Sequence, residues 1–214
     1  MKHKNRFITA VLLLAVLLVG LFFYQRNSAQ ENQQQAQHQQ LLYRADAPGF
    51  GDPQAAVHIV EFFDPACGTC RDFYPMVKHL MDNYPGRVRL TLRYAPFHPG
   101  SDLVVQALEA AHRQGQVDPA LQALFAAQGE WVVNHRAQLD RIWVPLARAG
   151  LDVPRIQADM NNPDIARTIA QDLAAANALE VTMTPEYFVN GKPLPSFGFE
   201  QLRTLVEEAL SSAH

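Results

Sequence analysis

The chain opens with an apolar run, and a polar tract separates this run from a long stretch of mixed pattern. Residues 7–24 are largely apolar and uncharged, with three basic residues before them and one soon after. A helix of this length covers roughly 27 Å at 1.5 Å per residue, close to the thickness of a bilayer core. The pattern predicts a transmembrane signal anchor at residues 7–24, with residues 1–6 in the cytoplasm.

The flanks of this run favour an anchor over a cleaved signal peptide. The apolar core of a signal peptide is usually shorter, roughly 7 to 15 residues, and small residues follow it at the cleavage site. The candidate site at residues 27–29 lacks a small residue three before the cut. We therefore expect a single-pass protein of the bacterial inner membrane, with its folded part in the periplasm, where disulfides can persist.

Residues 25–47 are predicted to be a glutamine-rich linker. Seven of the eleven residues from Gln30 to Gln40 are glutamine, and such a tract cannot bury a core. It is interpreted as a spacer, either flexible or helical. An oligomerisation helix is the alternative, but no apolar heptad supports one, and the oligomeric state stays open.

A strand–helix–strand unit opens the predicted domain at residues 48–214. Residues 55–63 form a nearly continuous apolar run, which is typical of a buried strand. Residues 71–83 carry apolar side chains at helical spacing, with Pro75 expected to kink the helix. Residues 88–94 alternate between apolar and polar, which predicts a strand with one polar face.

Helical patterns alone fill residues 99–179. Expected starts are Ser101 as a cap, Asp118-Pro119 and Asn162-Pro163, and residues 139–146 indicate a further helix. Strand character returns at residues 180–189, before the hairpin signal Asn190-Gly191, and residues 200–210 have the pattern of an amphipathic final helix. The sequence therefore predicts an α/β domain that carries a helical insertion.

The charge of the domain argues against a nucleic-acid partner. Residues 41–214 carry 14 Lys and Arg against 20 Asp and Glu, a formal charge of −6. A nucleic-acid-binding protein needs a basic face, and the sequence shows none.

The two cysteines, Cys67 and Cys70, lie where the first strand gives way to a helix. The first N–H groups of a helix have no intrahelical partner and carry partial positive charge, so a thiolate at Cys67 should be stabilised. Cys70, one turn deeper, should be less accessible. Cys67 can therefore attack a disulfide, and Cys70 can resolve the mixed disulfide that results.

A zinc site and an inert pair of cysteines are the alternatives. Structural zinc needs four ligands, but the chain has no further cysteine, and its histidines are scattered without close pairing. We expect neither a bound metal nor a cofactor.

From residue 57 to residue 210 the chain resembles the DsbA-like thiol:disulfide oxidoreductases of the thioredoxin fold. The resemblance rests on the Cys-x-x-Cys after Glu-Phe-Phe, the helical insertion, Thr184-Pro185 before a Tyr-Phe-Val-Asn-Gly hairpin, and the amphipathic last helix. It implies a thioredoxin fold with the insertion between a βαβ half and a ββα half. It also implies that Pro185 is cis and faces the dithiol, and that Thr184, Pro185, Gly68 and Thr69 contact the substrate.

Glu61 lies inside the first apolar strand, six residues before Cys67. Burial without a partner should raise the pKa of its carboxyl, unless the side chain points to solvent at a strand end. The resemblance implies that Glu61 accepts the proton of Cys70.

The residues between the cysteines depart from the pattern of the strongest oxidants of the family, which carry Pro-His there. Gly68-Thr69 supplies no charge to stabilise the thiolate. A less stabilised thiolate makes a weaker oxidant, so we expect an intermediate redox potential and leave oxidase, reductase and isomerase activity open.

Three functions remain possible from the sequence. The first is an enzyme that exchanges disulfides with exported proteins and is reset by a redox partner in the membrane. The second is a copper-tolerance protein that binds Cu(I) through Cys67, Cys70 and Met183, all of them soft ligands. The third is a non-catalytic adaptor that assembles through its glutamine-rich stalk.

Overall fold

The computed structural model describes residues 20–30, 33 and 36–212, which fall into two compact units, Met1–Gln40 and Leu41–His214. The first unit is helical wherever it is described, so the part of the glutamine-rich tract that can be seen is helical. None of the helices within the described residues is long and apolar enough to cross a bilayer. Most of the span predicted at residues 7–24 lies outside those residues.

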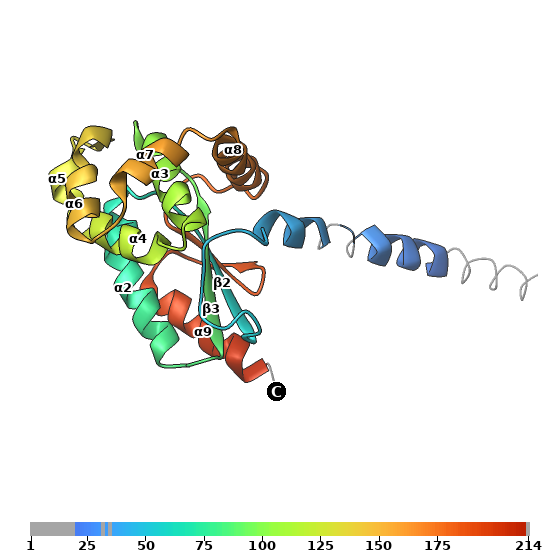
Figure 1. Ribbon diagram of the computed structural model, residues 1–214. Coiled ribbons are helices and arrows are strands. Elements are labelled where there is room, and N and C mark those ends of the chain that lie inside the picture. The colour runs from blue at the N-terminus through green and yellow to red at the C-terminus, as the bar shows by residue number, and fades with distance from the viewer. Residues whose placement is uncertain (1–19, 31–32, 34–35, 213–214) are drawn as a thin grey trace, which may run out of the picture. The chain divides into compact units, whose positions relative to one another are not determined.

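A five-stranded sheet forms the centre of the second unit (Figure 1), in the order β1-β3-β2-β6-β7. The strands β2 and β3 run parallel, and every other neighbouring pair is antiparallel. The strand β2 is buried throughout, as predicted. The strand β3 forms where it was expected, but the face predicted to be polar is largely buried as well, with Thr91 8% and Arg93 3% exposed. The strands of this sheet are β1 (Gly49–Phe50), β2 (Val57–Phe63), β3 (Val88–Tyr94), β6 (Glu186–Val189) and β7 (Lys192–Pro193).

Helices cover both faces of the sheet. Val57, Ile59 and Phe63 of β2 belong to the larger core, which also contains residues of α2, α3 and α9, whereas Val60 and Phe62 pack in a smaller cluster with residues of α8. Figure 1 shows the helices of the insertion gathered at one end of β2 and β3. The helices are α2 (Gly68–Asp82), α3 (Ser101–Arg113), α4 (Val117–Ala126), α5 (Gln128–Trp131), α6 (Trp143–Arg148), α7 (Val153–Asp159), α8 (Pro163–Ala178) and α9 (Phe199–Ser212).

The structure confirms the helical insertion but differs from the predicted details. The helix expected at residues 139–146 is a 3₁₀ turn, Leu139–Arg141, followed by α6, because Pro145 lacks the N–H that would continue a helix through Arg141. The insertion also contains α7 and a small hairpin of β4 (Val132–Val133) and β5 (Arg136–Ala137), which the sequence pattern did not predict.

Two further predictions were wrong. The strand expected at residues 180–189 begins only at Glu186, directly after Pro185, which has no N–H to donate to a neighbouring strand. Ser101 does not cap α3. Gly100 occupies the cap, and the Ser101 hydroxyl donates instead to the Asp64 carboxylate at 2.6 Å. The Asn190-Gly191 hairpin is confirmed, with φ values of 47° and 85° at the two turn residues.

Asp172 of α8 ties the insertion to the sheet. Its fully buried carboxylate accepts hydrogen bonds from Arg93 Nε at 2.7 Å, Arg44 Nε at 3.0 Å and the backbone N–H of Tyr94 at 2.9 Å. Arg93 also donates to the carbonyls of Leu41 and Leu42, so one cluster joins α8, β3 and the start of the domain.

The Asp172→Ala variant should lose about 3 kcal/mol or more of unfolding free energy, since it leaves two arginines near the core without their partner. Urea denaturation measures this loss. The control is Glu130→Gln, which breaks an exposed ion pair with Arg148 and should change stability by less than about 0.5 kcal/mol. Equal effects of the two changes would contradict the structural role of Asp172.

Candidate active site

The two cysteines lie at the carboxyl end of β2, where the chain turns into α2. Cys67 is the N-cap residue of α2, with an extended backbone (φ −73°, ψ 122°), and Cys70 is in the first turn. Both are free thiols in this structure. Cys67 is 6% exposed and Cys70 is fully buried, so Cys70 is the less accessible thiol, as the sequence predicted.

The surroundings of Cys67 favour its thiolate. The pKa of Cys67 is lowered to about 5, first by a hydrogen bond from the Cys70 thiol and further by the backbone N–H groups of Cys70 and Thr69 at the start of α2. Burial opposes this shift but does not outweigh it. The pKa lies between those of the reactive thiols of DsbA, about 3.5, and thioredoxin, about 7.

Cys70 and Glu61 are shifted in the opposite direction. Burial raises the pKa of Cys70 well above its ordinary value, and the neighbouring Cys67 and Glu61 raise it further. Glu61 is 2% exposed, which excludes the alternative that it points to solvent, and burial raises the pKa of its carboxyl to about 8. Tyr187 of the adjacent strand β6 pairs in register with Glu61, and its hydroxyl opposes part of this rise in the Glu61 pKa.

The loop before β6 lies against Cys67. In the thiol form Cys67 Sγ donates to the carbonyl oxygen of Thr184 at 3.2 Å. The Thr184-Pro185 peptide bond is cis, which confirms the prediction made from the resemblance. Chain segments more than a hundred residues apart therefore meet at one sulfur atom.

Gln128 is a site residue that the sequence analysis missed. It lies at the start of α5, it is buried, and its Nε2 donates to the carbonyls of Pro65 at 2.8 Å and of Cys67 at 3.0 Å. It thereby fixes the turn before α2 from the helical insertion. No pattern around Gln128 marked it out, because its partners are backbone groups of a distant segment.

Asp64 supports the same turn from the sheet side. Its buried carboxylate accepts from the backbone N–H of Ala66 at 2.8 Å, from the backbone N–H of His98 at 2.7 Å and from the Ser101 hydroxyl. The His98 ring also contacts it, with Nδ1 at 2.8 Å from Oδ2. Asp64 follows β2 directly, and this position at a strand end was the only sequence signal that could have found it.

The described part of the chain contains no group of three or more His, Cys, Asp or Glu side chains that could hold a metal ion. Met183, considered as a third soft ligand, has a 58% exposed side chain.

Comparisons with known proteins show the family and the fold of the chain. Residues 44–208 match a family model described as Thioredoxin. The solved structure of a thioredoxin-like oxidoreductase from Silicibacter pomeroyi DSS-3 is 32% identical, superposes with a TM-score of 0.69, and covers 80% of this chain and 96% of its own.

Curated relatives fall into two groups. The thiol:disulfide interchange protein DsbA of Salmonella typhi is 28% identical over 153 residues, which cover 69% of this chain and 70% of that protein. The Na(+)/H(+) antiporter NhaA of Herminiimonas arsenicoxydans is 31% identical over 144 residues, 67% of this chain but 22% of the antiporter. This chain thus spans under a quarter of that antiporter's length. It belongs to the thioredoxin family and has the architecture of the DsbA-like thiol:disulfide oxidoreductases.

Proposed function

We propose that this protein exchanges disulfides with exported proteins through Cys67 and Cys70. The observation that carries the proposal is the position of Cys67 Sγ at the start of α2, where its pKa is lowered to about 5 and where the Thr184 carbonyl lies 3.2 Å away. A thiolate that is present at neutral pH and lies beside the backbone of Thr184 is suited to attack the disulfide of an extended substrate.

The exchange proceeds in two steps. The Cys67 thiolate attacks a substrate disulfide, one substrate sulfur leaves as thiolate, and a mixed disulfide forms. Cys70 then loses its proton to the Glu61 carboxylate and attacks the Cys67 sulfur, which releases the second substrate thiolate and leaves the Cys67–Cys70 disulfide. The reverse sequence oxidises a substrate dithiol. The residues that border the Cys67 sulfur hold the substrate chain. These are Thr184, Pro185, Gly68 and Thr69.

The thiolate of Cys67 also bears on the direction of electron flow. A pKa of about 5 stabilises the reduced form more than in thioredoxin and less than in DsbA, which supports an intermediate potential. A redox partner in the membrane would then set the direction by oxidising or reducing the pair. The apolar run at residues 7–24, with three basic residues before it, supports export and a membrane tether.

The Cys70→Ser variant should accumulate mixed disulfides with thiol proteins through Cys67. Serine keeps a hydroxyl donor beside the Cys67 sulfur but cannot resolve the adduct. Non-reducing electrophoresis with mass spectrometry measures the adduct, and a variant with both cysteines changed to serine is the control. If Cys70→Ser forms no more adduct than this control, the exchange mechanism is wrong.

The Glu61→Gln variant tests the proton acceptor. With Cys67 preloaded with thionitrobenzoate, release of the chromophore reports the attack of Cys70 alone. In the parent protein this rate should rise with pH around the Glu61 pKa of about 8, and in Glu61→Gln it should fall by roughly 10²-fold and lose that inflection. Glu186→Gln on the adjacent strand is the control. An unchanged pH profile in Glu61→Gln would exclude the role.

Glu61 should also make stability depend on pH. The pKa of Glu61 is about 8 in the fold and 4.5 when unperturbed. Between these two pH values the folded chain therefore holds a proton on this carboxyl that the unfolded chain has lost. Its contribution to stability is therefore full below pH 4.5 and is lost as pH rises through 8. Denaturation of the reduced protein across this window should show a smaller decline with pH in Glu61→Gln than in the parent. Equal declines would mean that the carboxyl is ionised when folded.

A further inference from the structure

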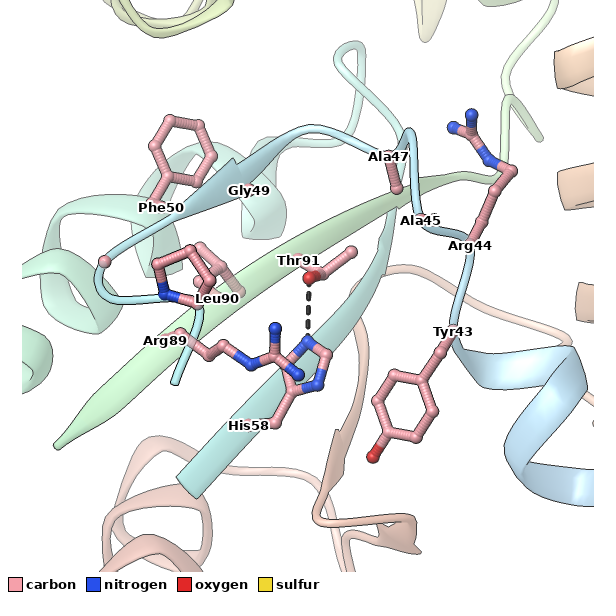
Figure 2. Close-up of a pocket in the computed structure, with 12 residues that line it drawn as sticks. Tyr43, Arg44, Ala45, Ala47, Gly49, Phe50, His58, Arg89, Leu90 and Thr91 are labelled. Carbon is pink, nitrogen blue, oxygen red and sulfur yellow. Dashed lines mark hydrogen bonds between the residues drawn. The ribbon is translucent and has the colours of Figure 1, made fainter. Parts of the chain in front are cut away.

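A cavity of about 400 Å³ lies at the end of the sheet remote from the dithiol. It opens over the first residues of β2 and β3, beneath the segment from Tyr43 to Pro53, which contains β1. Figure 2 shows this segment arching over the two strands. His58 is the second residue of β2, whereas Cys67 lies four residues beyond the last, so roughly 15 Å of strand separates the cavity from the active site. Pockets for small ligands start at roughly 300 Å³.

One wall of the cavity is a fixed pair of rings. The Tyr43 ring stacks on the His58 ring with centroids 4.6 Å apart and an interplanar angle of 22°. His58 Nε2 lies 2.7 Å from Thr91 Oγ1, which sets the orientation of the imidazole, as Figure 2 shows. This wall is therefore ordered without a ligand.

Arg89 brings an uncompensated positive charge to the same place. Its guanidinium lies beside the His58 ring (Figure 2), and its Nε is buried without a hydrogen-bond partner. Across the described residues, no carboxylate forms an ion pair with Arg89. The segment Tyr43–Pro53, which covers the cavity, has two acidic residues, and both have other partners. Asp46 pairs with Arg44 at 2.9 Å, and Asp52 accepts from the backbone N–H of Gln54 at 2.8 Å.

The other polar groups of the cavity do not offset this charge. Burial, with the charge of Arg89, lowers the pKa of His58 to about 4, so the imidazole is neutral at physiological pH. Arg44, on the rim, is already bound to Asp172 and Asp46. Ala45, Ala47 and Pro53 supply apolar lining. The cavity thus combines one free cation, one ordered aromatic wall and an apolar border.

We propose that this cavity is a binding site for a small organic carboxylate. The carboxylate pairs with the Arg89 guanidinium, whose planar donors match the two carboxylate oxygens, and the apolar body lies under the covering segment against its alanines and proline. An anion there satisfies the buried Nε of Arg89, which is otherwise without a partner.

Benzoate is the probe, and calorimetric titration of the full-length protein measures its binding. We expect a dissociation constant of about 1 mM or lower, and binding at least about tenfold weaker for Arg89→Gln. The control Arg136→Gln removes an exposed positive charge from β5 and should bind benzoate as the parent does. Benzamide, the uncharged analogue, and inorganic phosphate, which lacks the apolar body, should both bind at least about tenfold more weakly.

The place where benzoate binds and the folding of Arg89→Gln are checked separately. Benzoate should shift the ring resonances of His58 and Tyr43, and circular dichroism should show that Arg89→Gln is folded. No binding of benzoate up to about 10 mM, equal binding by folded Arg89→Gln, or equal binding of benzamide or phosphate would overturn the proposal. Disulfide exchange should be unchanged in Arg89→Gln, so failure of this inference and failure of the proposed oxidoreductase activity are distinguishable.

Discussion

The structure of the active site depends on one electrostatic contact, between the Cys67 sulfur and the donors at the start of α2. The Cys70 thiol is the donor that lowers the Cys67 pKa most, and the cap position adds the N–H groups of Cys70 and Thr69, which have no intrahelical partners. A thiolate satisfies these donors better than a thiol does, which is why the pKa of Cys67 falls although the side chain is largely buried. Gln128 and Asp64 both hold the turn in place through hydrogen bonds to its backbone.

Burial of the active site separates the roles of the two thiols. Burial acts against the charged forms of Cys70 and Glu61, which raises both pKa values, whereas at Cys67 the hydrogen bond from the Cys70 thiol and the N–H groups at the helix start outweigh burial. The result is one sulfur that is ionised at neutral pH and one that needs a proton acceptor. A buried carboxyl with a pKa of about 8 can fill that need within the physiological range.

Sequence reasoning succeeded where the signal is local. The apolar runs of β2 and β3, the cysteine spacing and the Asn190-Gly191 turn each determine a structure within a few residues, and all were predicted correctly. It failed where distant segments meet. Gln128 and Asp172 act on backbone groups and arginines far away in the chain.

Titration of the Cys67 thiolate tests the account most directly. Ultraviolet absorbance of the reduced protein, with Cys67→Ser as the baseline, reports the ionised sulfur as pH is raised. The account predicts a midpoint near pH 5, set by the start of α2 and the Cys70 thiol. A midpoint at the ordinary value of about 8.5 would show that neither the Cys70 thiol nor the helix end stabilises this thiolate, and the proposed chemistry would then lose its basis.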